Sequence, residues 1–506
     1  MPWSDDLRTL FQRRPLQVVV LAVLLAIVGG RAMLLKFSVL DLDVWWHLKV
    51  GDWIVEYHAV PHTGILSRTA ADRPWAAYSW GYEVLLSRAY TWFGLVGMGI
   101  YGVLLTVGVA YSIFWMAQRL SGRFWWSCLL AAVTCSAFLY NLMPRPVFFS
   151  MMLFAVVLTL LLEASRTGRV KLLYWLPPLF VLWANLHIQF IYGLFLVGLL
   201  TSVNMVQHLA RRVGASPDFL LPPALPWKTL AAVFAACVVA GCIGPYTYHL
   251  FLIVYGYSQA KLPYTMIQEL QPINFRAGSH YMELLLTGGA FFALGWRKKV
   301  DLFKLSLLCA ASVIGYRTMR DSWFICMTAA ACIADSGTEA RELQESWREK
   351  AGLFAAVALS LLLFARNTDF NRRGLDRAIS SMFPVNAVNF LRQSPPPGPL
   401  YNTFDWGGFL TWYMPDYPVA IDGRTDLYGE DLDRRFFQTQ SGDESYLQDP
   451  YLNEAGVVLL QRKMPLARLL MNDPRFEKVY EDELAIVFVR RPGSDGTNSA
   501  APASKP

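Results

Sequence analysis

The sequence predicts an α-helical polytopic membrane protein with about eleven transmembrane helices and a small outward α/β domain at its C-terminal end. Of its 506 residues, 55% are hydrophobic, 14% are aromatic and only 16% are charged, and the mean hydropathy is +0.33. A soluble domain carries about 25% charged residues, so an ordinary soluble enzyme is disfavoured. A disordered chain is excluded, because so much apolar surface must be buried.

Eleven apolar runs are candidates for membrane-spanning helices, because a bilayer core about 30 Å thick requires about 20 apolar residues in a helix. The first run, at about 16–35, is long and is not followed by an A-x-A cleavage site, so we expect it to act as an anchor. A further run, 246–258, is short and is expected to be re-entrant or interfacial. The remaining candidate spans lie near 95–117, 124–140, 147–164, 172–187, 190–208, 229–245, 281–296, 303–316, 322–335 and 351–366.

Basic residues in the connecting loops predict the orientation of the chain. About eighteen Lys and Arg residues fall in every second loop, beginning with the N-terminal segment 1–15. The positive-inside rule therefore predicts a cytoplasmic segment 1–15, a transmembrane domain 16–366 and an outward C-terminal region. The intervening short loops carry few basic residues, chiefly Arg145, Lys261, Arg276, Arg317 and Arg320.

The C-terminal region divides into a folded domain at 367–490 and a tail at 491–506. The tail is expected to be disordered, whereas the domain is long enough to bury a core of its own. The domain is acidic, with roughly 18 Asp and Glu residues against 13 Lys and Arg. A small α/β module is predicted from strand-like runs at 399–403, 418–422, 456–460 and 484–489 and from helical signals at 384–393 and 465–472.

The outward loop 36–93 contains two amphipathic stretches, 44–57 and 80–93. Trp and Tyr side chains favour the boundary between lipid and water. We therefore expect the first stretch to form a helix in the membrane interface. One apolar side of that helix is made by Trp46, Val50, Trp53 and Tyr57.

An acidic pair, Asp41 and Asp43, stands at the start of this helix, beside His47. Either carboxylate alone is explained as a helix N-cap, but that role accounts for one acid and not for two. Snorkelling to lipid headgroups would explain any single Arg on the outward side. Several such groups facing an acidic pair indicate a site for an anion such as a lipid phosphate. Other polar residues in the outward connections are Arg145, Asn185, His187, Glu269, Arg317 and Arg320.

These features together resemble the GT-C superfamily of integral-membrane glycosyltransferases that use polyprenyl-phosphate-linked sugars. The resemblance rests on the Asp-x-Asp pair after the first span, the helices of the same outward loop and the outward C-terminal domain. The oligosaccharyltransferase signature WWDYG is absent from the sequence, and DWGG at 405–408 does not replace it, which argues against a peptide acceptor. Segments that look like an uncharacterised bacterial branch of this superfamily are 145–150, 182–187, 406–410 and 421–429.

The resemblance implies an inverting hexosyl or pentosyl transferase that moves a sugar from a polyprenyl-phosphate donor to an acceptor. The reaction is then expected at the outer face of a bacterial inner membrane, with the C-terminal domain in the periplasm. Asp43 is expected to act as general base and Asp41 to orient the acceptor, the reverse assignment being open. Contacts with the lipid phosphate or substrate are expected from His47, Arg145, His187, Arg317 and Arg320.

The expected partners are membrane lipids, the lipid-linked sugar donor and a glycan, lipid or protein acceptor, and not a nucleic acid. A divalent metal is not favoured as a cofactor, although Asp41, Asp43 and His47 are near enough in sequence to share one. In the C-terminal domain, Asp422, Arg424 and Asp426 are expected to form an exposed loop with internal ion pairs rather than to contact a sugar acceptor.

Two other classes of function are open. A transporter or lipid flippase also places charges inside a helical bundle, but transporters commonly show repeated halves, and no clear internal repeat is found here. A non-catalytic assembly protein would bind a partner through its outward domain, and it would not require an acidic pair beside the first span.

Overall fold

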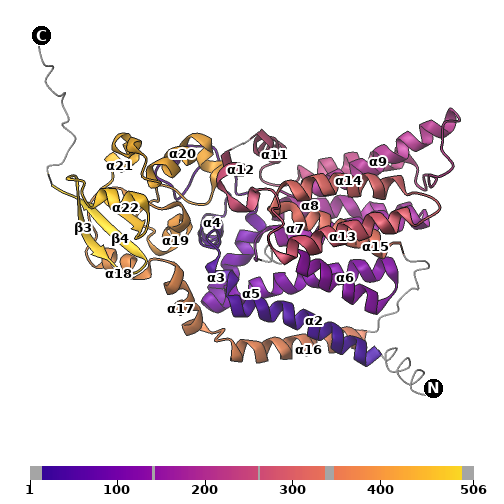
Figure 1. Cartoon of the computed structure of the whole chain (residues 1–506), viewed down its shortest axis with the longest axis horizontal. Helices are drawn as coiled ribbons and strands as arrows, with labels where there is room; N and C mark the ends of the chain where they lie inside the picture. Colours follow the sequence, from indigo (N-terminus) through magenta and orange to yellow (C-terminus); the bar gives the residue numbers. More distant parts are fainter. Residues whose placement is uncertain (1–13, 139–142, 260–261, 337–346, 493–506) are drawn as a thin grey trace, which may run out of the picture.

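The structure is a computed structural model, and it describes residues 14–138, 143–259, 262–336 and 347–492. A helical bundle makes up one end of the molecule and an α/β domain the other (Figure 1). Helix α2 (Arg14–Leu35) begins at the end of the bundle that is farther from the C-terminal domain (Figure 1). The predicted disordered tail lies almost entirely outside the described residues.

Each of the eleven predicted apolar runs contains a helix, although the run 229–245 is helical only to Gly241 and the run 172–187 is divided between η2 and α8. Five helical segments, Arg14–Leu40, Trp80–Ser121, Val147–Thr167, Phe190–Arg212 and Lys350–Asn367, are long and apolar enough to cross a membrane. The mostly helical architecture is therefore confirmed, and the count of eleven spans stays a prediction. The bundle comprises α2, α5 (Trp80–Ser121), α6 (Phe124–Ala137), α7 (Val147–Thr167), α8 (Leu176–Leu186), α9 (Phe190–Arg212), α10 (Trp227–Gly241), α13 (Gly278–Gly295), α14 (Leu302–Arg317), α15 (Ser322–Ala334) and α16 (Trp347–Asn367).

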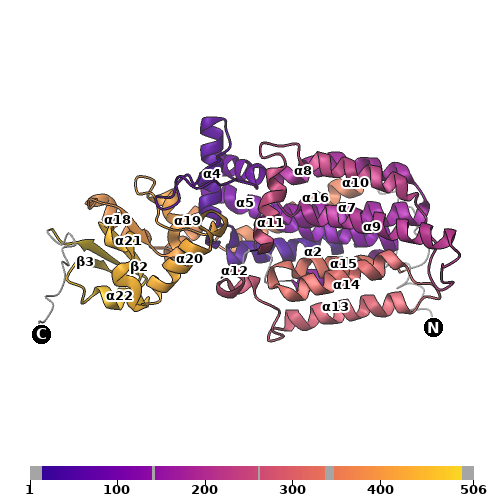
Figure 2. The ribbon, with the colours of Figure 1, turned by 90° about the horizontal axis from the view of Figure 1, so that it is seen from above.

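Short helices occupy the connections between these long ones. The run 246–258 becomes α11 (His249–Gln259), which lies at the end of the bundle nearest the C-terminal domain (Figures 1 and 2). The others are α3 (Phe37–Leu40), α4 (Val44–Tyr57), α12 (Leu262–Met266), η2 (Val170–Trp175), η3 (Gln268–Leu270) and η4 (Met319–Asp321).

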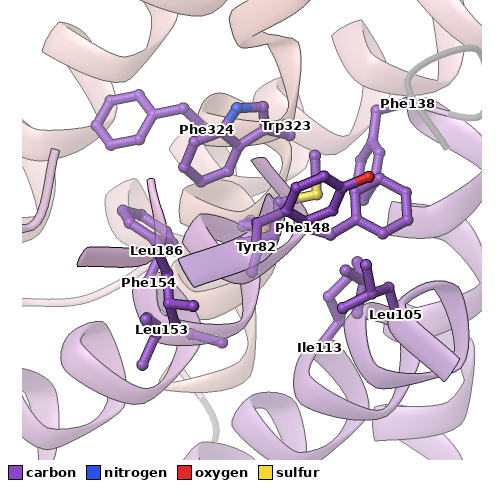
Figure 3. Close-up of a cluster of buried hydrophobic side chains, with 14 of the residues drawn as sticks. Tyr82, Leu105, Ile113, Phe138, Phe148, Leu153, Phe154, Leu186, Trp323 and Phe324 are labelled. Carbon is purple, nitrogen blue, oxygen red and sulfur yellow. The ribbon is translucent and has the colours of Figure 1, made fainter. Parts of the chain in front are cut away.

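Close packing of side chains from distant helices forms the bundle core (Figure 3). The ring of Phe154 on α7 lies 5.3 Å from the rings of both Trp323 and Phe324 on α15, measured between centroids. Small residues bring other helices together, since a Cβ atom added at Gly29 of α2 would lie 2.7 Å from Leu361 of α16. In a lipid solvent such van der Waals contact between helices replaces much of the usual hydrophobic driving force.

The amphipathic stretch 80–93 is helical and forms the part of α5 before Gly94. At Gly94 the backbone is not helical, with φ +59° and ψ −143°, so α5 consists of two helices that meet at a kink. A glycine adopts this positive-φ conformation without a steric penalty. The stretch 80–93 is therefore joined to the helix after the kink without an intervening loop.

The apolar side of α4 is also placed differently from the prediction. Trp46 and Val50 are 7% and 0% exposed, and they belong to a hydrophobic cluster that includes Leu427 and Tyr428 of the C-terminal domain. The first half of α4 is therefore covered by protein and not by the lipid interface, because the C-terminal domain packs onto it. Figure 2 shows α4 and α19 (Phe404–Tyr413) at the junction of bundle and domain.

The C-terminal domain contains a four-stranded sheet in the order β1-β2-β4-β3. Strand β1 (Leu400–Asn402) is parallel to β2 (Val457–Gln461), while β4 (Ala485–Arg490) is antiparallel to both β2 and β3 (Phe476–Glu481). Besides α19, the helices of the domain are α17 (Arg372–Met382), α18 (Val385–Gln393), α20 (Thr425–Gln440), η5 (Glu444–Gln448), α21 (Pro450–Asn453) and α22 (Pro465–Leu470).

Three of the four predicted strands and both predicted helices are confirmed in this domain, but the strand at 418–422 is wrong. Val419 instead accepts a hydrogen bond from the backbone of Arg68 at 2.9 Å and donates one to Leu66 at 3.1 Å. The segment therefore pairs with the first outward loop and not with the sheet. Strand β3 was missed because most of its side chains are exposed, so it lacks an apolar pattern.

The contact between α4 and α5 requires a glycine at position 51. A Cβ atom added there would lie 2.0 Å from the backbone oxygen of Glu83, so we expect Gly51→Ala to destabilise the folded chain by about 1–3 kcal/mol. Thermal unfolding of the detergent-purified protein measures this as a lower Tm. Gly288→Ala on α13 is the control, because no atom lies within 4 Å of the added Cβ. Equal Tm values for the two variants would contradict the close packing of α4 on α5.

Candidate functional site

The acidic pair lies in the turn between α3 and α4, at the junction of bundle and C-terminal domain. Asp43 is the N-cap residue of α4, but its side chain accepts no capping hydrogen bond. Asp41 Oδ1 instead accepts the backbone N–H of Asp43 at 2.9 Å. The N-cap explanation therefore fails for the Asp43 carboxylate, which accepts the indole N–H of Trp46 at 3.1 Å.

Arg145, just before α7, binds three carboxylates at once. Its Nε lies 2.6 Å from Asp41 Oδ2, and its two terminal nitrogens lie 3.5 Å from Asp43 Oδ2 and 3.1 Å from Glu269 Oε2. A single guanidinium thus joins the first outward loop to the loop before α13. The sequence predicted Arg145 and both aspartates as site residues, and the structure brings these three together.

Arg320 extends this group of charges. Its guanidinium lies 3.8 Å from Glu269 Oε1, and 43% of its side chain remains exposed. Arg317, three residues earlier, is directed elsewhere and lies over the ring of Tyr264 at 5.7 Å. Of the two predicted arginines in this connection, Arg320 therefore joins the acidic pair through Glu269, and Arg317 does not.

The two predicted histidines are held by neighbouring side chains. His47 Nδ1 lies 2.9 Å from Glu83 Oε1, and its ring rests on Trp46 with centroids 3.5 Å apart. Burial, and then the positive charge of Arg145, hold the pKa of His47 well below its usual value, so the ring is neutral at neutral pH. His187 Nδ1 lies 2.8 Å from Ser150 Oγ.

The electrostatics distinguish the carboxylates from one another. Burial raises the pKa of Asp43 to about 6, against the opposing charge of Arg145, although 25% of the side chain is exposed. Burial also opposes ionisation of Glu269, but Arg145 and Arg320 lower its pKa overall. The pKa of Asp43 is thus raised, whereas that of Glu269 is lowered.

A metal site is not formed by the described residues: within them, no group of three or more His, Cys, Asp and Glu side chains is arranged to hold a metal ion. The three ligands considered from the sequence are separated because His47 binds Glu83, while Asp41 binds Arg145.

The C-terminal domain reaches the acidic pair through Gly423. A Cβ atom added there would lie 2.0 Å from Asp43 Oδ1, so only glycine fits. The expected internal ion pair is present between Arg424 and Asp422 at 2.6 Å, but the loop is not exposed, because both side chains are 0% exposed. Its burial follows from the close docking of this segment on the first outward loop.

The sequence gave no site role to Trp75 and named Glu269 only as a polar residue of a connecting loop. For Asp426, a contact with a sugar acceptor was considered, and an exposed loop with internal ion pairs was preferred. The indole N–H of Trp75 donates to Asp426 Oδ2 at 3.0 Å, a contact between residues 351 positions apart. No local pattern predicts that these two residues meet, because their contact depends on how the domain docks.

The sequence matches no family model, and no curated protein matches it significantly. Its fold is similar to that of the apo oligosaccharyltransferase of Archaeoglobus fulgidus, with a TM-score of 0.52 and 11% identity over 95% of this chain and 75% of that one. The oligosaccharyltransferase AglB of the same organism, in complex with an inhibitory peptide and a dolichol-phosphate, gives a TM-score of 0.51 and 10% identity over 87% and 69% of the two chains. ArnT from Cupriavidus metallidurans, bound to undecaprenyl phosphate, gives a TM-score of 0.45 and 13% identity. The match covers 94% of this chain and 99% of that one.

The architecture is thus that of the GT-C glycosyltransferases, to which the two archaeal oligosaccharyltransferase structures belong. The resemblance inferred from the acidic pair and the outward domain is confirmed for the fold. At about a tenth sequence identity, the activity and the site residues are not carried over with the fold.

Loss of Arg145 would leave three carboxylates without their shared cation. We expect Arg145→Gln to destabilise the chain by about 3–5 kcal/mol, the usual cost of breaking a buried ion pair. A lower Tm of the purified protein measures this effect. Arg276→Gln is the matched control, because Arg276 is exposed in the loop before α13. An unchanged Tm for Arg145→Gln would show that Arg145 does not hold the three carboxylates together.

Proposed function

We propose that the chain is an inverting membrane glycosyltransferase that moves a sugar from a polyprenyl-phosphate donor to an acceptor. The observation that carries this proposal is the Asp43 carboxylate, partly exposed and with a pKa raised to about 6, beside Arg145 in a GT-C fold. The dolichol-phosphate bound by the archaeal relative in fold supports a lipid-phosphate donor. The reaction is placed at the outer face of a bacterial inner membrane.

In the proposed reaction, Asp43 accepts the proton of an acceptor hydroxyl as its oxygen attacks the anomeric carbon. A new C–O bond forms while the bond from that carbon to the phosphate oxygen breaks. The leaving lipid phosphate keeps the bonding electrons, so negative charge develops on it. A single displacement of this kind inverts the anomeric configuration.

Arg320 and Arg145 are the proposed partners of that developing charge. Arg320 is the better placed to receive the phosphate, because 43% of its side chain is exposed and its ion pair with Glu269 is long at 3.8 Å. His47 and His187 lie behind this surface, each already bonded to a neighbour. They are proposed to position the site and not to bind the phosphate directly.

Asp41 is proposed as a positioning residue and not as the base. It is 4% exposed, and its two oxygens are used by Arg145 and by the backbone N–H of Asp43. These contacts hold the turn that presents the Asp43 carboxylate. The geometry therefore favours Asp43 over the reverse assignment.

The proposed topology has eleven spans within 16–366, a cytoplasmic N-terminus and the domain 367–490 outside. The start of α2 and the C-terminal domain at opposite ends of the bundle support this arrangement (Figure 1). Asp43 and Arg145 then lie at the outer surface, where a lipid-linked donor and an extracytoplasmic acceptor can meet.

Asp43→Asn tests the mechanism directly, because the amide cannot accept the hydroxyl proton. We expect the rate of sugar transfer to fall by at least about 100-fold. Asp41→Asn is also expected to abolish sugar transfer. The assay uses nanodisc-embedded protein with undecaprenyl-phosphate-linked hexoses and pentoses, and it measures released undecaprenyl phosphate. Asp52→Asn, at an exposed position on the same helix, is the control. Wild-type transfer by folded Asp41→Asn and Asp43→Asn proteins would remove the mechanism.

The raised pKa of Asp43 also predicts a pH dependence. The base must be ionised, so transfer is expected to fall as the pH falls through about 6, by about tenfold per pH unit below that value. Initial rates of sugar transfer between pH 4.5 and pH 8 measure this fall. A rate that stays constant down to pH 4.5 would assign the proton transfer to another group.

A further inference from the structure

We propose that Asp426 of the C-terminal domain, together with the hydroxyl groups of Tyr78 and Tyr257, binds the acceptor, and that this acceptor is a saccharide. The inference rests on the proposed transferase function, and it adds an acceptor class and a specificity-determining residue. The C-terminal domain then supplies one part of a site whose other part belongs to the bundle.

The position of Asp426 relative to Asp43 is rigidly determined. Between them, Gly423 packs directly on Asp43, and Arg424 donates to the backbone oxygen of Ile65 at 2.8 Å. The Arg424 guanidinium also lies 4.8 Å from the centroid of Trp75. These contacts hold residues 423–426 against the loop 36–93, so Asp426 lies on a segment that packs against both Asp43 and Trp75.

Asp426 differs from the nearby Asp422 in its partners. Asp422 is neutralised by Arg424, which binds both of its oxygens. Within the described chain, Asp426 forms no ion pair, and Trp75 provides a neutral donor to its Oδ2 at 3.0 Å. Burial raises the pKa of Asp426 to about 6, against the opposing charge of Arg424. A shielded carboxylate without a directly paired cation is costly, which indicates a use for it beyond holding one indole.

Two phenols accompany this carboxylate. The hydroxyl groups of Tyr78 and Tyr257 lie 3.1 Å apart, and after burial the charge of Asp426 contributes to the raised pKa of Tyr78. The charge of Arg320 acts on the pKa of Tyr78 in the opposite sense, so the phenol is within electrostatic range of both the carboxylate and the proposed phosphate-binding arginine. Asp426, Tyr78 and Tyr257 are all half-buried, whereas Trp75 behind them is buried.

This combination of groups matches the chemistry of a sugar. Hydroxyl groups of a saccharide can donate to a carboxylate and exchange hydrogen bonds with phenols, and its C–H faces can pack on aromatic rings. The acceptor hydroxyl that loses its proton to Asp43 would then be oriented by the rest of the same sugar at Asp426. A carboxylate without a bound cation is well suited to several donors at once.

Binding of saccharide to the intact, nanodisc-embedded protein tests this proposal without any need for transfer. The probes are short oligosaccharides made by partial acid hydrolysis of the envelope polysaccharide of the source cell, with saturation-transfer NMR as the readout. We expect Asp426→Asn to weaken binding by about tenfold, while undecaprenyl phosphate binding is unchanged. Asp431→Asn on the same helix is the control, because Asp431 is exposed and paired with Arg73.

The asparagine variant also separates a binding role from a structural one. Its amide oxygen can still accept the indole N–H of Trp75, so a residue that only holds Trp75 would tolerate the change. Tyr257→Phe, which removes one hydroxyl and keeps the ring, is expected to weaken saccharide binding as well and serves if Asp426→Asn does not fold. In a transferase assay, Asp426→Asn should raise the acceptor KM and leave acceptor-independent release of undecaprenyl phosphate unchanged.

The outcomes distinguish this inference from the function on which it rests. Saccharide binding that depends on Asp426, with no sugar transfer by the wild-type protein, would keep the binding site and reject the transferase. Equal binding by the wild type and both variants would overturn the role of Asp426. Binding of peptides but of no saccharide would overturn the acceptor class.

Discussion

The site depends on one shared cation. The guanidinium of Arg145 holds the carboxylates of Asp41, Asp43 and Glu269, which come from two loops far apart in the sequence. Without it, three negative charges would face one another at the end of an apolar bundle. Their mutual repulsion is poorly screened there, because the surroundings have a low dielectric constant. Arg145 lies closer to Asp41, at 2.6 Å, than to Asp43, at 3.5 Å. Burial therefore still raises the pKa of Asp43 against the charge of Arg145.

Glycine is the second requirement, because it lets the C-terminal domain approach this charged group. Gly423 leaves no room for a side chain against Asp43, and a Cβ atom added at Gly408 would lie 2.6 Å from the backbone oxygen of Leu42. The same docking buries Trp46 and brings Asp426 to Trp75. The domain therefore packs directly against the acidic pair, which gives a physical reason for the glycines at this contact.

Much of the architecture was predictable from local patterns. Apolar runs identify helices because the side chains of each run must be buried in protein or surrounded by lipid. Three strands of the C-terminal sheet also show a continuous apolar run. The acidic pair and Arg145 were recognisable because charges beside membrane spans are unusual and require partners. The predictions failed where a segment is covered by a distant one, as at 418–422, at the apolar side of α4 and at the buried Asp422–Arg424 pair.

Composition and periodicity thus determine which segments are helical, which are apolar and which polar residues need an explanation, since these properties reside in neighbouring residues. The choice of partner is a property of the tertiary structure. Arg145 pairs with Glu269 across 124 positions and Trp75 with Asp426 across 351, and no local pattern encodes such distances. Only the packing of the C-terminal domain on the bundle decides that Asp43 stands beside Gly423, because that contact exists only once both parts have folded.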